Sequence, residues 1–146
     1  ILSQSDSVLA LTPQSRFCDV RQRPLQFRPG IGHLAARVER AAFLPMAVEY
    51  VYWEERLPEI LVRFGPVIDV TREKNSTLNA QEWTALFEET LSETQDALAM
   101  DSQARDPANF KMLLSGEAGQ GGVYDWGRAL RAKWRGETFQ KEHGTK

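Results

Sequence analysis

Four arginines crowd into one short polar segment that follows the apolar run of residues 8–11. They are Arg16, Arg21, Arg23 and Arg28, and Asp19 is the only acid between residues 12 and 29. A guanidinium group matches two oxygens of a phosphate at once, so a loop of this composition is typical of a phosphate-binding site. The alternative is that these arginines are solvated or paired with carboxylates elsewhere in the chain.

Two further patterns accompany the arginines. The first is Thr12-Pro13-Gln14-Ser15-Arg16, and the second is residues 43–50, which read Phe-Leu-Pro-Met-Ala-Val-Glu-Tyr. They resemble two conserved blocks of the phospholipid and glycerol acyltransferase family, the glycerophosphate and lysophosphatidate acyltransferases. The family block that residues 12–16 resemble usually reads Phe-Pro-Glu-Gly-Thr-Arg. The block that residues 43–50 resemble is an apolar strand entered through a proline. The spacing of the blocks is also similar, and the resemblance covers about residues 7 to 70.

The resemblance implies an enzyme that transfers a fatty acyl group from acyl-CoA or acyl carrier protein to a hydroxyl of a glycerophosphate or lysophospholipid. It makes Arg16 the group that binds the acceptor phosphate, in a loop shaped by Thr12, Pro13, Gln14 and Ser15. We add Arg21 and Arg23 to this predicted substrate-binding site on charge grounds alone. No metal or other cofactor is expected, because the cysteine and the two histidines lack metal-ligand spacing.

The chain departs from the family pattern in two respects. Gln14 stands where the block has a carboxylate, and Ser15 stands where it has a glycine. The family's catalytic block, His-x-x-x-x-Asp, is missing, because Val38 is the fifth residue after His33 and His143 lies too near the end. We therefore interpret the chain as the C-terminal part of a longer enzyme. We expect it to contain no catalytic residue and to be inactive alone.

Composition narrows the class of protein. With 146 residues, 42% of them hydrophobic, the chain can bury a core. A net charge of −2 argues against bulk nucleic-acid binding. The single Cys18 permits no internal disulfide and suits the cytoplasm. No apolar run is long enough to span a bilayer, so we expect any contact with the cytoplasmic face of a membrane to be peripheral.

The first half predicts an α/β fold. Residues 7–11 read as a short buried strand, and residues 31–43 as a helix entered at Gly30, with apolar residues at helical spacing. Residues 46–53 and 59–65 read as two strands joined by a tight connection at 54–58. Together they predict a partial glycerophosphate acyltransferase-like domain over residues 1–78, a right-handed βαβ unit plus a hairpin.

The second half, residues 79–146, predicts a helical extension packed on that domain. Asn79 and Glu82 form a capping-box pattern, and an apolar stripe from Trp83 continues to about Met100. A polar linker at 101–109 and a glycine-rich loop at 115–122 precede a basic helix at 124–135. That helix carries Trp126, Leu130 and Trp134 on one face, which suits an anionic membrane surface or docking on the domain equally well.

Two other functions remain open at this stage. The chain without a catalytic block could be a phospholipid- or phosphate-binding module with no chemistry. It could also bind nucleic acid through the arginines and the basic helix, although no basic strand interleaved with aromatic residues supports this. We expect the partners to be the acyl donor and the phosphate-bearing acceptor, and no nucleic acid.

Overall fold

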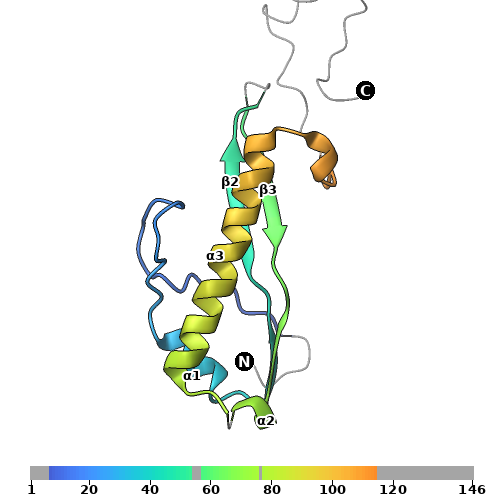
Figure 1. The fold of residues 1–146 in the computed structure, drawn as a ribbon. Coiled ribbons are helices and arrows are strands. Elements are labelled where there is room, and N and C mark those ends of the chain that lie inside the picture. The colour runs from blue at the N-terminus through green and yellow to red at the C-terminus, as the bar shows by residue number, and fades with distance from the viewer. Residues whose placement is uncertain (1–6, 54–56, 76, 115–146) are drawn as a thin grey trace, which may run out of the picture. The chain divides into compact units, whose positions relative to one another are not determined.

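The computed structural model describes residues 7–53, 57–75 and 77–114. The chain divides into two compact units, the first made of residues 1–48 and 62–100 and the second of residues 49–61 and 101–146. The described residues form a mixed α and β structure with antiparallel strands and one long helix (Figure 1). The predicted boundary after residue 78 lies within the first unit.

Four strands form two ladders. Strand β1 (Arg40–Phe43) is antiparallel to β4 (Ile68–Thr71), with Arg40 facing Thr71 and Phe43 facing Ile68. Strand β2 (Met46–Val51) pairs with β3 (Glu59–Phe64), and the two run in opposite directions (Figure 1). These two strands confirm the predicted hairpin. Both begin at the predicted residue, and their C-terminal ends are shorter than predicted by two residues in β2 and by one in β3.

A β-bulge links the two ladders. The Gly65 amide donates to the Pro45 carbonyl at 2.9 Å, while two residues earlier Phe43 already faces Ile68. Leu44 therefore opposes two residues, Pro66 and Val67. Neither Pro45 nor Pro66 has an N–H to give, so the ladder is interrupted where the chain carries prolines.

The predicted helix over residues 31–43 is only half right. Helix α1 (Gly30–Ala35) begins where expected but ends after six residues. Residues 40–43 instead pair with β4, and burial alternates along them, with Ala41 and Phe43 more buried than Arg40 and Ala42. The hydrogen bonds to β4 join residues far apart in the chain. They outweigh the local preference for a helix that the spacing of the apolar residues indicates.

The predicted strand at residues 7–11 is wrong. These residues lie in no strand, and their apolar side chains are exposed, with Val8 at 93%. A β-prone run becomes a strand only where a neighbouring strand completes its hydrogen bonds, and both ladders are formed by other segments. Because this strand is missing, the described residues contain no βαβ unit.

Helix α3 (Ala80–Ala104) confirms the predicted long helix and its start. The Asn79 side chain accepts hydrogen bonds from the amides of Gln81 and Glu82, and the Glu82 carboxylate accepts from the Asn79 amide at 2.7 Å, which is a complete capping box. The helix runs four residues beyond Met100. The predicted polar linker is therefore partly helical, and a 3₁₀ turn, η1 (Pro107–Asn109), follows.

The core of the first unit joins α3 to α1 and to the β1–β4 ladder. Its buried members are Ala35, Val70, Trp83 and Phe87. The Phe87 ring stacks on Phe43, with centroids 4.6 Å apart. The short helix α2 (Arg72–Asn75) connects β4 to the segment before α3.

Threonines, unpredicted from the sequence, complete the buried face of α3. Thr90 and Thr94 are buried, and each hydroxyl donates to the carbonyl four residues earlier, Leu86 and Thr90, at 2.7 Å. This local bond satisfies the hydroxyl and lets a short β-branched side chain face the core.

Gly65 lies close to the buried Thr94 side chain of α3. A methyl group at Gly65 would lie 2.2 Å from the Thr94 hydroxyl oxygen, a clash that Gly65→Ala can relieve only by moving a buried side chain. We expect Gly65→Ala to lower the free energy of unfolding by about 1–3 kcal/mol, as overpacking does. Urea denaturation of the full chain measures this loss.

A double-mutant cycle tests whether the contact with the Thr94 hydroxyl causes the loss of stability. Adding Thr94→Ala removes the clashing oxygen and should make Gly65→Ala nearly neutral, whereas Thr94→Val keeps an atom at that place and should not rescue. Equal costs of Gly65→Ala in all three backgrounds would contradict the contact.

The predicted glycine-rich loop at 115–122 and basic helix at 124–135 lie outside the described residues. Among the residues that are described, no helix combines the length and apolar character needed to cross a membrane.

Candidate functional site

The predicted phosphate-binding residues lie in one closed loop, residues 12–28, here called the arginine loop. Its ends meet where the Arg28 amide donates to the Pro13 carbonyl at 2.8 Å. Two turns shape the interior, one closed by Ser15 N–H to Thr12 and one by Gln22 N–H to Asp19. A loop whose ends are bonded together is a compact Ω-type loop, a common place for binding residues.

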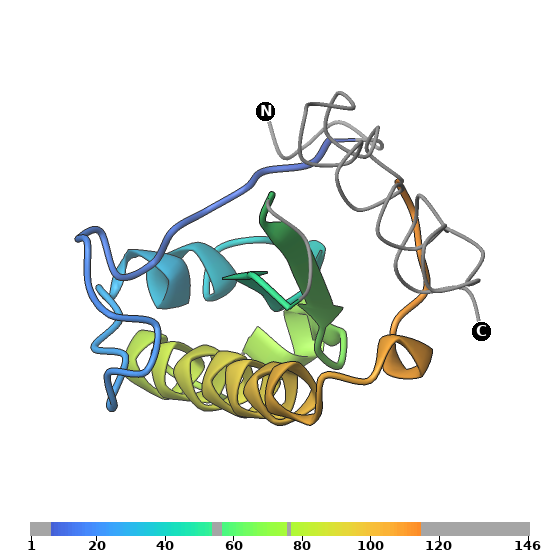
Figure 2. The same cartoon turned by 90° about the horizontal axis from the view of Figure 1, so that it is seen from above.

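Helix α3 anchors the loop. The Glu88 carboxylate accepts hydrogen bonds from two successive loop amides, Gln26 and Phe27, both at 2.9 Å. Leu25, beside them, is fully buried. Figures 1 and 2 show the loop lying along α3 in both views. Phe27 packs against the core cluster that contains Trp83 and Phe87 of α3. The helix therefore supports the loop through a charged hydrogen-bond acceptor as well as through this apolar contact.

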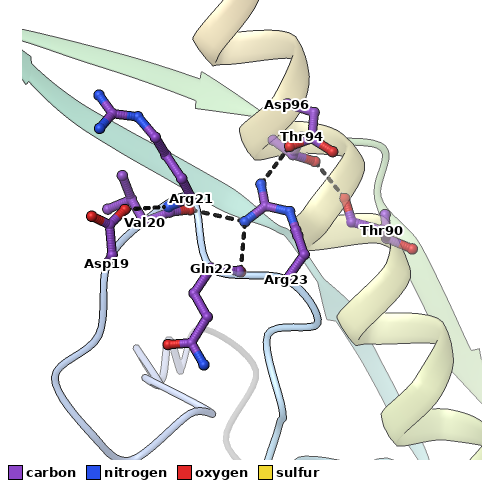
Figure 3. A network of polar contacts seen from close by, with 8 residues as sticks. All are labelled: Asp19, Val20, Arg21, Gln22, Arg23, Thr90, Thr94 and Asp96. Atoms are coloured by element: carbon purple, nitrogen blue, oxygen red, sulfur yellow. Dashed lines mark hydrogen bonds and ion pairs between the residues drawn. The ribbon is translucent and has the colours of Figure 1, made fainter.

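Arg23 completes this anchoring. Its guanidinium pairs with the Asp96 carboxylate on α3 and donates to the loop carbonyls of Val20 and Gln22 at 2.9 and 3.0 Å (Figure 3). With three partners inside the chain, Arg23 holds the loop in place. It would have to exchange a carboxylate for any phosphate it contacted.

The other arginines face solvent without a carboxylate partner among the described residues. Arg16 is exposed and donates from Nη2 to the neutral Gln26 side-chain oxygen at 2.7 Å. Arg21 and Arg28 are also exposed, and in Figure 3 the Arg21 guanidinium points away from that of Arg23. The acid of the loop, Asp19, accepts from the Arg21 amide at 2.8 Å and so closes a turn. These guanidinium groups therefore present an excess of positive charge.

The loop differs from the family block at Gln14 and Ser15. The structure gives Gln14 a side-chain hydrogen bond and Ser15 an unusual backbone conformation. The half-buried Gln14 amide donates from Nε2 to the Leu25 carbonyl at 2.9 Å, a bond that an ionised carboxylate could not make. Ser15 has a φ of 53°, in the left-handed region that favours glycine. Thr12 is exposed and Pro13 is half-buried, at the start of the loop.

Cys18 also lies in the arginine loop. Cys18 is a half-buried free thiol. The described residues contain no group of three or more histidine, cysteine, aspartate or glutamate side chains that could hold a metal ion.

Sequence reasoning missed the carboxylates that position the loop. Glu88 and Asp96 are eight residues apart on α3, which is slightly more than two turns, so they lie on one face of the helix. That spacing was the available signal. The spacing does not indicate which segment these carboxylates contact, because the arginine loop lies more than sixty residues earlier in the chain.

Arg16, Arg21 and Arg28 are thus the exposed cations of a loop that Arg23, Gln14 and Glu88 hold in shape. Comparison of the chain with protein-family models, with curated proteins and with solved structures gave no match.

Proposed function

We propose that the arginine loop binds the acceptor phosphate in a glycerolipid acyltransferase, with Arg16 as the principal contact and Arg21 as a second cation of the same loop. The observation that carries this proposal is the state of Arg16. Its guanidinium is exposed and steadied by the neutral Gln26, so it keeps both its charge and its remaining N–H donors for a ligand.

The backbone at Ser15 supports the likeness to the acyltransferase block. That block has glycine at this place, and the φ of 53° at Ser15 is one that glycine adopts at no steric cost. The loop conformation here is therefore one that the family's usual residue would also favour.

The proposed reaction moves a fatty acyl group from acyl-CoA or acyl carrier protein to a hydroxyl of a glycerophosphate or lysophospholipid. Arg16 would hold the phosphate so that the hydroxyl meets the thioester carbon. A general base must take the hydroxyl proton, and the 146 residues contain no His-x-x-x-x-Asp block. The proposal therefore places the base outside these residues, and places the enzyme in the cytoplasm or at the cytoplasmic face of a membrane.

Binding of glycerol 3-phosphate tests the proposal. Arg16→Ala removes one charge-assisted contact, which should cost about 1.5–3 kcal/mol, a 10- to 150-fold weaker affinity. Arg16→Lys should recover part of the loss, because it restores the charge without the fork. Titration calorimetry with the full chain measures both.

Arg37→Ala is the matched control, because Arg37 is an exposed arginine outside the loop. It changes net charge by the same amount and should leave the affinity unchanged. Equal affinities of the wild-type chain, Arg16→Ala and Arg37→Ala would show that Arg16 is an ordinary surface residue.

A further inference from the structure

The backbone at Gln26 has a conformation that its own side chain does not favour. Its φ is 58°, in the left-handed region where a residue with a Cβ atom is strained. Gln26 is also exposed, so burial of its side chain does not hold it there. Such a conformation persists where the surrounding contacts determine it. The contacts of Gln26 therefore decide how this part of the arginine loop is oriented.

The Glu88 carboxylate on α3 provides two of these contacts. Its Oε1 accepts from the Gln26 amide and its Oε2 from the Phe27 amide, both at 2.9 Å. Successive backbone N–H groups that converge on one anion form a nest, a conformation that includes a left-handed residue. Phe27 is also held on its other side, because it packs against the core cluster. These two hydrogen bonds, here called the Glu88 clamp, therefore fix the backbone of Gln26.

The Gln26 side chain contacts Arg16 across the loop. Its Oε1 accepts from Arg16 Nη2 at 2.7 Å, and Arg16 lies ten residues earlier in the chain. The backbone conformation of a residue determines which directions its side chain can take. The position of the Gln26 side-chain oxygen therefore depends on the Glu88 clamp. Glu88 and Arg16 both bind Gln26, one through its backbone and the other through its side chain.

We propose that Glu88 is the positioning residue of the phosphate site and that it acts through Gln26 to orient the Arg16 guanidinium. This inference rests on the proposed function, since it takes Arg16 as the phosphate contact. The neutral amide of Gln26 lets an acidic residue orient an arginine without neutralising it. The carboxylate binds two backbone N–H groups, and the guanidinium keeps its charge for the ligand.

The sign of one effect separates positioning from simple charge. Glu88→Gln removes a negative charge, and by Coulomb's law alone this would strengthen the binding of an anion nearby. Glutamine, however, has one acceptor oxygen in place of two and puts an NH₂ donor opposite the second amide, so one bond of the Glu88 clamp is lost. We expect Glu88→Gln to weaken the affinity of the full chain for glycerol 3-phosphate about 2- to 10-fold.

Glu89→Gln is the matched control, because Glu89 is the next residue of α3 and is exposed. It removes the same charge and leaves the Glu88 clamp intact, so the affinity for glycerol 3-phosphate should stay the same or rise slightly. Equal or tighter binding by Glu88→Gln than by the wild-type chain would overturn the inference.

Gln26→Gly tests the second step, from Gln26 to Arg16. Glycine adopts a φ of 58° without steric cost, so the Glu88 clamp stays and only the acceptor for Arg16 is lost. We expect a loss of affinity similar to that of Glu88→Gln. Wild-type affinity in Gln26→Gly would contradict the role of Gln26.

A double-mutant cycle tests whether Glu88 acts through Arg16. In the Arg16→Ala background, Glu88→Gln should have no further effect on the affinity, because the group that it positions is gone. A merely structural role would lower the affinity by the same factor with and without Arg16. An equal factor in both backgrounds would therefore overturn the inference.

Nitrogen-15 NMR of the full chain without ligand tests the positioning apart from binding. Glu88→Gln should shift the side-chain N–H resonances of Arg16, and Glu89→Gln should leave them in place. Unchanged Arg16 resonances in Glu88→Gln would overturn the inference. Absence of glycerol 3-phosphate binding by the wild-type chain would instead contradict the proposed function, and the Arg16 resonances would still decide whether Glu88 orients Arg16.

Discussion

Replacing Gly32 with alanine is expected to cost more than about 3 kcal/mol of unfolding free energy, which is a large part of the about 5–15 kcal/mol that typically stabilises a folded domain. Gly32 is buried in α1, where the helix passes the start of α3. An added methyl group would lie 1.9 Å from the Ala80 carbonyl oxygen and 2.2 Å from the Thr84 hydroxyl oxygen. Because one of these atoms belongs to the backbone, no change of rotamer relieves the clash. Circular dichroism during urea denaturation measures the loss.

Gly30→Ala is the matched control on the same helix. No atom lies within 4 Å of a methyl group at Gly30. Alanine is the better helix former, so this change should be neutral or stabilise the chain by up to about 1 kcal/mol. A loss at Gly30 as large as that at Gly32 would show that the helix, not the close approach to α3, sets the cost.

The purified chain is expected to show no acyl transfer from a thioester to glycerol 3-phosphate or a lysophospholipid. Loss of a general base lowers a rate by about 100- to 10,000-fold, and the chain has no His-x-x-x-x-Asp block to supply one. Release of free thiol from acyl-CoA, followed with and without acceptor, is the measurement.

The control for this experiment is the chain with Arg16→Ala. Acceptor-dependent thiol release by the wild-type chain that disappears in Arg16→Ala would place a complete active site within the 146 residues, contrary to the expectation. Release that is the same in both chains and independent of acceptor is background.

Short-range signals in the sequence were read correctly. The capping box of Asn79 and Glu82 acts within one turn, so its residues alone determine where α3 begins. The hairpin was found for a similar reason, because two strand-like runs flank a short connection. Both features depend on neighbours in the chain.

Long-range contacts decided the features that were misread. Residues 40–43 have helical spacing, but they pair with β4, about thirty residues later in the chain. Residues 7–11 have strand composition and lie in no ladder. In both places the deciding hydrogen bonds depend on a partner strand that the local pattern does not specify.

In the candidate site, too, the sequence shows the local feature but not the long-range contacts. Its arginines are visible as a cluster in the sequence, but their separate roles are not. Arg16 and Arg23 are both arginines of one loop, and only the structure shows that Arg23 contacts Asp96 and two loop carbonyls while Arg16 contacts the neutral Gln26. The site residues themselves stay a prediction, to be tested by binding.

The two glycine–threonine contacts on α3 bear on how relatives of this chain can be recognised. Gly32 meets Thr84, and Gly65 meets Thr94, in each case with no room for one more methyl group. Substitutions at these positions should therefore covary among homologues, so that a larger residue at position 65 accompanies a smaller one at position 94. Position 32 should stay glycine, because a backbone oxygen cannot covary. This spacing of small residues is a fingerprint for distant relatives that overall sequence identity would not reveal.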